Sequence, residues 1–131
     1  GLTLATSAPA VFKALVEATA FGSRAINERM LEEGVPIDNI IAIGGIARKS
    51  SFVMRTMADV MGMPIRVLDS DQACALGAAM FAAVAAGVHG SVAEAQRAMR
   101  PGFSDEYRPD MERHAIYDYL YARYLKLGAA R

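Results

Sequence analysis

The fold of this chain is decided by the stretch Asn39-Ile-Ile-Ala-Ile-Gly44-Gly45-Ile-Ala-Arg48-Lys49-Ser50. An apolar run typical of a buried strand ends at the glycine pair, and a helix is predicted to begin at Ser50. Glycines permit positive φ angles and let a ligand approach the backbone, while Ser50 can cap the helix, whose first N–H groups then face an anion. The junction is therefore typical of a phosphate or nucleotide site.

Arg48 and Lys49 break a local rule at this junction. They bring two positive charges to the positive end of the predicted helix dipole, which costs roughly 0.3–1 kcal/mol each when nothing compensates. Departures of this kind tend to mark functional sites. The charge pattern thus supports a binding role for the junction.

The composition indicates one cytoplasmic domain with a sizeable core. The chain has 131 residues, 53% of them hydrophobic, and its 14 basic and 14 acidic residues cancel, so the basic surface of a nucleic-acid binder is missing. Its single cysteine, Cys74, cannot form an internal disulfide, and the N-terminus lacks the pattern of a signal peptide. The uncharged run 72–88 is short and rich in alanine, which predicts a buried helix rather than a membrane span.

Helices and strands alternate along the chain. Helices are predicted at about 9–33, 50–61, 72–87, 91–99 and 111–127, strands at 39–43 and 64–68, and a loop at 100–110. The residues expected to face the core are Val11, Leu15, Ala18, Gly22 and Ile26 in the first helix and Phe52, Met57, Val60 and Met61 in the second. The helix at 72–87 is apolar on all sides and is expected to lie between other elements, with its N-cap supplied by Asp69-Ser70-Asp71.

This alternation implies a parallel α/β arrangement, in which ligands gather at the C-terminal ends of the strands. Two strands are too few for a parallel sheet buried on both faces. Either further strands escape the pattern, or the sheet is incomplete because the remaining strands lie elsewhere in a larger chain. The beginning at Gly1-Leu2 without a methionine favours the second interpretation.

The glycine pair can be compared with three kinds of nucleotide site. A Walker A loop needs a second glycine directly before the lysine, and Arg48 stands there instead. A dinucleotide fingerprint needs Gly-x-Gly-x-x-Gly, of which only the later acid, Asp69, is in place. The third kind, a double-glycine turn against the adenosine of ATP, needs no further glycine and fits best.

Three ordered segments resemble the C-terminal domain of FGGY-type sugar kinases, the bacterial L-ribulokinase branch above all. They are Gly44-Gly45-Ile-Ala-Arg-Lys-Ser50, Ala58-Asp59-Val-Met-Gly-Met-Pro64 and Ser70-Asp71-Gln72-Ala-Cys-Ala-Leu-Gly77-Ala-Ala-Met-Phe-Ala-Ala-Val-Ala. The resemblance covers nearly all of residues 1–131. It implies an α/β fold of the ribonuclease H-like, actin-like ATPase class, with this chain as the C-terminal, adenosine-binding part of the second kinase domain and an incomplete sheet.

Carried over residue by residue, the resemblance places Gly44, Gly45 and Ile46 along the adenosine and α-phosphate. It places Lys49 and Ser50 near the adenine or ribose, although ribulokinases often have asparagine where this chain has Ser50. The family's catalytic aspartate belongs to an upstream motif, so no catalytic residue is assigned here. Asp59 and Asp69 are expected to face solvent or to cap turns.

The implied activity is ATP-dependent phosphorylation of a sugar, L-ribulose to L-ribulose 5-phosphate, in arabinose catabolism. Its cofactors are ATP and Mg²⁺, its other partner is the sugar, and a homo-oligomer is expected. The 131 residues alone are expected to be inactive, because they lack the catalytic aspartate. The alternative is a non-catalytic nucleotide-binding or interaction module of the actin/Hsp70-like class.

The remaining candidate residues have simpler interpretations. His89 and His114 lack the spacing of a metal pair and are expected to be solvated. Cys74 is expected to be buried as a small apolar residue. The tyrosines at 117, 119, 121 and 124 follow helical spacing, which favours packing over base stacking.

Overall fold

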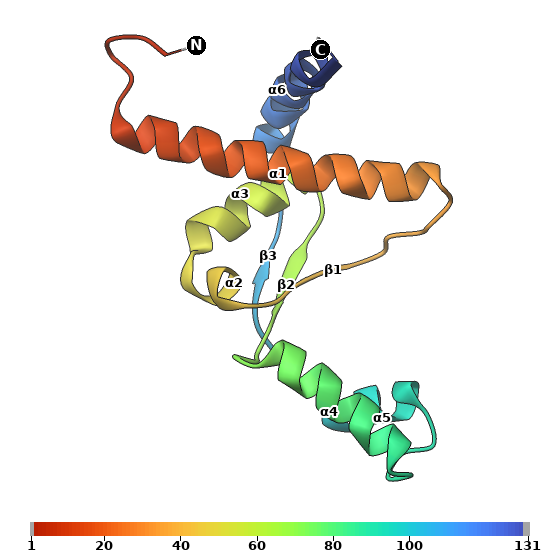
Figure 1. The fold of residues 1–131 in the computed structure, drawn as a ribbon. Coiled ribbons are helices and arrows are strands. Elements are labelled where there is room, and N and C mark those ends of the chain that lie inside the picture. The colour runs from red at the N-terminus through yellow and green to blue at the C-terminus, as the bar shows by residue number, and fades with distance from the viewer. Residues whose placement is uncertain (1, 130–131) are drawn as a thin grey trace. The chain divides into compact units, whose positions relative to one another are not determined.

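A computed structural model describes residues 2–129, which form six helices and three strands (Figure 1). These elements divide into two compact units. Unit 1 comprises residues 1–40, 51–65 and 107–131, and unit 2 comprises residues 41–50 and 66–106. The chain therefore enters and leaves unit 2 twice.

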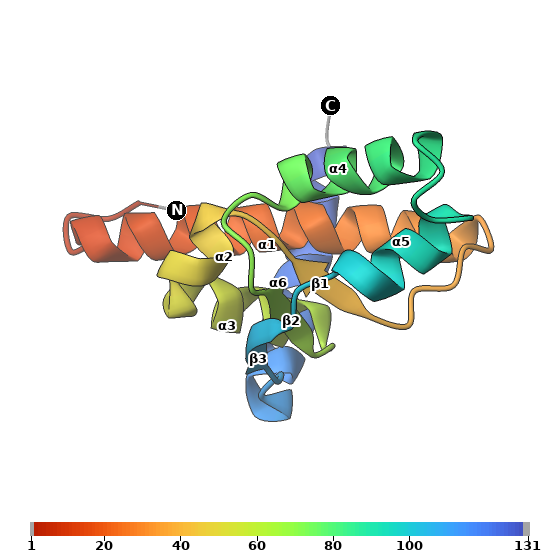
Figure 2. The ribbon, with the colours of Figure 1, turned by 90° about the horizontal axis from the view of Figure 1, so that it is seen from below.

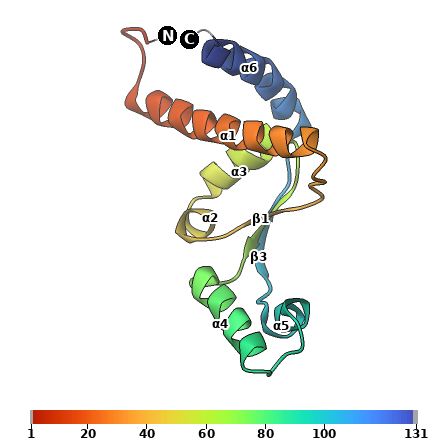
Figure 3. The ribbon, with the colours of Figure 1, turned by 45° about the vertical axis from the view of Figure 1, so that its right-hand side comes forward.

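Unit 1 is built from three helices, α1 (Ala8–Glu32), α3 (Ser51–Met61) and α6 (Met111–Ala129), which pack against one another (Figure 3). The predicted helices at 9–33 and 111–127 are confirmed. Ser7 begins α1 by accepting a hydrogen bond from the Ala10 N–H at 3.4 Å. Gly34 ends it with φ at 82°, where the Val35 N–H reaches the Met30 carbonyl at 2.9 Å.

The core of unit 1 is aromatic. Phe21 packs against Tyr117, Tyr121 and Tyr124, with ring centroids 5.5–6.1 Å apart. Val60 of α3 is fully buried in the same cluster. The packing role predicted for the tyrosines is confirmed for Tyr117 and Tyr121, which are 9% and 4% exposed.

The prediction of which face of α1 is buried was wrong. Val11, Leu15 and Ile26 are 40–63% exposed, whereas Val16, Ala20 and Phe21 are buried. The helix carries apolar residues on more than one side, so periodicity alone could not tell which side α3 and α6 would cover. In α3 the fully buried Val60 was predicted, but Phe52 is 44% exposed and the buried Met54 and Ala58 were missed.

The helix predicted at 50–61 is confirmed as α3, and a further short helix that was not predicted comes directly before it. A short helix, α2 (Gly45–Lys49), is followed by Ser50 in an extended conformation, and α3 begins at Ser51. Ser50 is thus the residue that closes α2, and its own N–H bonds to the Ile46 carbonyl at 3.0 Å. The helix start therefore lies at the glycine pair itself.

Three strands form one sheet in the order β1 (Ile40–Ala42), β2 (Ile65–Leu68) and β3 (Phe103–Tyr107). The two predicted strands are confirmed, but β3 falls in the segment predicted as a loop. The Asp69 N–H, just after β2, donates to the Gly102 carbonyl, just before β3, at 3.0 Å. The end of β2 therefore lies beside the start of β3, and these strands run in opposite directions, so the sheet is not wholly parallel.

Unit 2 contains α2 and two further helices, α4 (Ala73–Ala85) and α5 (Val92–Met99), which contact each other (Figure 2). The serine half of the capping box predicted for α5 is confirmed, since the Ser91 hydroxyl accepts from the Glu94 N–H at 3.2 Å, but the Glu94 carboxylate accepts from the Gly90 N–H at 2.9 Å instead of the Ser91 N–H. For α4 the cap differs from the prediction, because the N-cap is Gln72 and it makes no side-chain cap bond. Ser70 instead accepts from the Gln72 N–H at 3.2 Å.

The expectation that α4 lies between other elements was wrong for the residues that the structure describes. Met80 is its one buried residue, and Phe81 is 64% exposed. Alanines provide little side chain to interdigitate, so α4 covers its neighbours along one side and leaves the rest open.

Candidate functional site

The glycine turn joins β1 to α2 inside unit 2. Gly44 has φ 90° and ψ 178°, a conformation that is essentially restricted to glycine, and it caps α2 without a side-chain bond. Gly45, by contrast, is the first helical residue and has no positive φ. The positive φ that the sequence allowed at either glycine is therefore needed only at Gly44.

The backbone of this turn is open. A Cβ atom built at Gly44 or Gly45 meets no atom within 4 Å. Ile46 is 68% exposed, whereas Ala47, the next residue, is 4% exposed. A planar ligand could therefore approach the main chain of the turn without displacing a side chain among the described residues.

Lys49 and Ser50 follow on the same short helix. Lys49 is exposed and makes no ion pair with the residues that the structure describes, while Ser50 is half-buried. The five predicted site residues, Gly44, Gly45, Ile46, Lys49 and Ser50, thus form one continuous surface segment apart from the partly covered Ser50.

The charge conflict predicted at this junction is resolved by the true helix boundaries. Because α2 begins at Gly45, Arg48 and Lys49 occupy its last turn, where cations are favourable. Arg48 is further paired with Asp71, Nη1 to Oδ1 at 2.5 Å, and with Asp69, Nη2 to Oδ1 at 3.5 Å. Sequence reasoning missed these pairs, although two acids after a strand facing a basic helix were a usable signal.

A separate pocket of about 580 Å³ lies in unit 2 and contains none of residues 44–50. Side chains of the sheet, α4 and α5 line it, among them Ile41, Leu76, Met80, Arg97 and Phe103. Its walls are mainly apolar. The Arg66 guanidinium, 4.4 Å from the centre of the Phe103 ring, holds the start of β3 on that side of the sheet.

A family model for the C-terminal domain of the FGGY family of carbohydrate kinases matches residues 1–86. The chain belongs to this family. The FGGY domain is 48% identical over 127 residues to a ribulokinase of Vibrio parahaemolyticus, covering 97% of this chain and 22% of that protein. The chain thus spans less than a quarter of the length of this relative.

Solved structures agree with the family. The FGGY domain superposes on a structure titled as a xyloylose kinase from Brucella ovis with a TM-score of 0.86 at 26% identity, covering 99% of this chain and 26% of that one. It also superposes on Plasmodium falciparum glycerol kinase, solved with ADP, with a TM-score of 0.74, covering 96% and 25%. At 18% identity the second likeness shows the fold alone. The fold is the α/β, ribonuclease H-like, actin-like ATPase fold predicted from the sequence.

The acids of the FGGY domain that were expected at the surface divide into two cases. Asp69 is exposed and pairs with Arg48. Asp59 is 4% exposed, so of the two predicted alternatives it does not face solvent but acts as a cap. Its carboxylate accepts from the Asp110 N–H at 2.8 Å at the start of α6, which makes it a structural cap.

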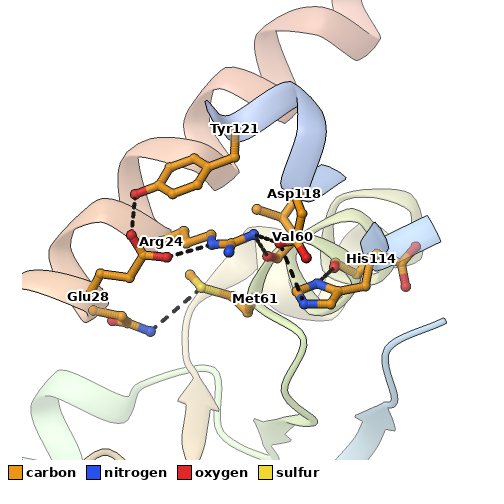
Figure 4. A network of polar contacts seen from close by, with 9 residues as sticks. Arg24, Glu28, Val60, Met61, His114, Asp118 and Tyr121 are labelled. Carbon is orange, nitrogen blue, oxygen red and sulfur yellow. Dashed lines mark hydrogen bonds and ion pairs between the residues drawn. The ribbon is translucent and has the colours of Figure 1, made fainter. Parts of the chain in front are cut away.

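Unit 1 of the FGGY domain holds a polar network around Arg24 (Figure 4). The guanidinium bonds to Glu28 at 2.8 Å, to Asp118 at 2.6 Å and to the Val60 carbonyl at 3.2 Å. Burial would lower the pKa of Arg24, but the hydrogen bonds to the two carboxylates raise it. The network therefore joins α1, α3 and α6 around a permanent charge and makes a structural rather than a catalytic cluster.

Two tyrosines of this unit are held in their neutral form. Burial, with a hydrogen bond to Glu17, raises the pKa of Tyr117 to about 12. Burial, with a hydrogen bond to Glu28, raises the pKa of Tyr121 to about 12. Neither phenol can act as a base near neutral pH.

Three remaining side chains differ from expectation. Cys74 is exposed rather than buried. His89 is half-buried rather than solvated, with its Nδ1 3.8 Å from Glu94 Oε1. His114 is half-buried rather than solvated, with Nδ1 2.8 Å from the Asp59 carbonyl oxygen and the ring against Gly62. Among residues 2–129 no three His, Cys, Asp or Glu side chains converge as a metal site, and no helix is long and apolar enough to cross a membrane.

Proposed function

We propose that residues 1–131 are the adenosine-binding, C-terminal part of the second domain of an ATP-dependent sugar kinase that converts L-ribulose to L-ribulose 5-phosphate. The open glycine turn carries the proposal, because Gly44 needs to be glycine and yet a Cβ atom added at Gly44 or Gly45 would contact no other residue within 4 Å. The family match supports phosphoryl transfer to a carbohydrate. The 48% identity to a ribulokinase supports the choice of sugar and a role in arabinose catabolism.

Each predicted residue has a role in this proposal. The backbone of Gly44 and Gly45 and the side chain of Ile46 line the adenosine and α-phosphate. Lys49, which is exposed and makes no ion pair with the described residues, reaches the adenine or ribose together with the Ser50 hydroxyl. A nucleotide seat is supported by the family match, because a carbohydrate kinase needs a nucleotide as phosphoryl donor.

The chemistry of transfer is assigned to the rest of the enzyme. Asp59 is used as a cap and Asp69 pairs with Arg48, so neither is placed to take a proton from a sugar. Mg²⁺ would accompany ATP in the whole enzyme, because metal neutralises phosphate charge during transfer. The described residues offer no metal cluster for it. We further propose a cytoplasmic homo-oligomer.

The sugar is tested with the full-length enzyme and a panel of L-ribulose, D-ribulose, xylulose and glycerol. L-Ribulose should give the highest kcat/KM. A clear preference for another sugar would refute the substrate, and no turnover with any sugar would favour a non-catalytic module of the actin/Hsp70-like class.

The nucleotide seat is tested by Lys49→Ala, with Lys126→Ala as the matched control because Lys126 is an exposed lysine near the end of α6. Lys49→Ala should raise the KM for ATP about fivefold, the equivalent of ~1 kcal/mol, and leave the KM for sugar unchanged. An ATP KM equal to that of Lys126→Ala would remove Lys49 from the site.

A further inference from the structure

The strongest feature of the turn that the proposed roles leave unused is Arg48. Its guanidinium reaches two carboxylates in the loop between β2 and α4, with Nη1 at 2.5 Å from Asp71 and Nη2 at 3.5 Å from Asp69. All three residues lie in unit 2. The side chain therefore ties α2 to a loop more than 20 positions away in the sequence.

Charge separates Arg48 from its neighbour Lys49. The positive charge of Arg48 faces two negative charges, whereas Lys49 makes no ion pair among residues 2–129. Because two carboxylates already offset the charge of the Arg48 guanidinium, it attracts a further anion only weakly. Lys49 is thus the cation left for a ligand, and Arg48 needs another explanation.

The ion pairs contribute little to global stability. The side chains of Arg48, Asp69 and Asp71 are 30%, 57% and 82% exposed, and exposed pairs of this kind are weak. Their effect is local instead. A five-residue helix cannot hold itself in place, and Ala47 is the one buried residue of α2.

The loop on the other side of the pairs is well anchored. The Asp69 N–H bonds to the Gly102 carbonyl at 3.0 Å, and the Ser70 N–H bonds to the Leu68 carbonyl at 2.9 Å. The Ser70 hydroxyl in turn accepts from the Gln72 N–H at 3.2 Å. Arg48 therefore joins a short, weakly held helix to a firmly held loop.

We propose that Arg48 is a positioning residue, which uses Asp71 and Asp69 to fix α2 and thereby the backbone of Gly44 and Gly45 for the nucleotide. This inference rests on the proposed function of the turn. Arg48 itself does not touch the ligand. Its loss leaves the turn mobile, so that ATP must bind a conformation that is only partly populated.

The test is a double-mutant cycle in the full-length kinase with Arg48→Ala, Asp71→Asn and the two combined. Each single change should raise the KM for ATP about two- to fivefold while the KM for sugar stays constant, and the combined variant should be no worse than Arg48→Ala. Asp38→Asn, an exposed acid for which no partner is described, is the control and should change nothing. Additive effects in the cycle would overturn the pairing.

A charge exchange strengthens the test. The variant with Arg48→Asp and Asp71→Arg together should recover most of the ATP affinity lost by Arg48→Asp alone, which a general loss of folding would not allow. Failure of the exchange to recover any affinity, with both proteins folded, would overturn the positioning role.

Two readouts keep this inference apart from the proposed function. If Lys49→Ala raises the KM for ATP and Arg48→Ala does not, the nucleotide seat stands and the positioning role is refuted. Amide hydrogen exchange measured without nucleotide does not depend on whether Lys49 or the glycine turn binds ATP. Residues 44–50 should exchange faster in Arg48→Ala than in the wild type, and unchanged exchange would refute the positioning role even if the nucleotide binds elsewhere.

Discussion

Replacing the two neighbouring glycines by alanine, one at a time, should have opposite consequences. Gly44 has φ 90° and ψ 178°, and a side chain in that region costs about 1–3 kcal/mol. Gly45 has a helical backbone and lies at the start of α2. Neither Cβ meets an atom within 4 Å, so no steric clash adds to either figure.

The difference between the variants isolates the backbone strain. Both changes reduce the conformational entropy of the unfolded chain alike, which stabilises the folded turn by about 0.4–1 kcal/mol in each case. The opening free energy of the turn should therefore be about 1–3 kcal/mol lower in Gly44→Ala than in Gly45→Ala. At 25 °C that is a factor of about 5 to 150 in the population of the open turn.

Amide hydrogen exchange of residues 42–50 in the full-length kinase measures this difference directly. Gly44→Ala should accelerate exchange there and raise the KM for ATP. Gly45→Ala should slow exchange slightly, because it restricts the unfolded chain without strain, but should still raise the KM for ATP, because its methyl group stands where the ligand approaches. Equal exchange in the two variants would refute the strain argument, and an unchanged ATP KM in Gly45→Ala would refute close approach of the nucleotide.

Three further predictions concern the rest of the chain. The isolated 131 residues should bind ATP or ADP weakly and release no sugar-dependent ADP, because the groups that position transfer are assigned elsewhere; ADP release above a protein-free blank would contradict this. The same chain should self-associate in sedimentation experiments and bind a hydrophobic dye, because it exposes large apolar side chains. Its exposed Cys74 should also react with a thiol reagent faster than Cys74 does in the full-length enzyme. Finally, the contribution of Tyr117 and Tyr121 to the free energy of unfolding should be fully present below pH 10 and should be lost as the pH rises to about 12. The reason is that the folded state raises the pKa of both phenols from 10.0 to about 12. Urea midpoints across this range should fall less steeply in Tyr117→Phe and Tyr121→Phe.

Elements with strong local signals were predictable from the sequence. The strands β1 and β2 are short apolar runs between turn residues. The start of α5 is fixed by the Ser91 hydroxyl, which accepts from the Glu94 N–H, and by the Glu94 carboxylate, which accepts from the Gly90 N–H. The glycine turn belongs to the same class, since a glycine pair after an apolar strand restricts the backbone to few choices.

Elements that depend on partners were not predictable. The strand β3 reads Phe-Ser-Asp-Glu-Tyr, and four of its five residues are exposed, so it lacks an apolar face that could reveal it. It forms because β2 offers an edge for pairing. The short helix α2 was also hidden, because five residues that begin at a glycine pair carry too little periodicity to predict a helix.

The two misassigned helix faces share one cause. Val11, Leu15 and Ile26 on α1, and the all-round apolar surface of α4, are patterns that normally accompany burial, yet the described residues leave them largely exposed. Periodicity indicates that an apolar helix face should be buried, but it does not indicate which residues bury it. The glycine turn escapes this ambiguity, since its shape depends on φ and ψ at Gly44 rather than on distant packing.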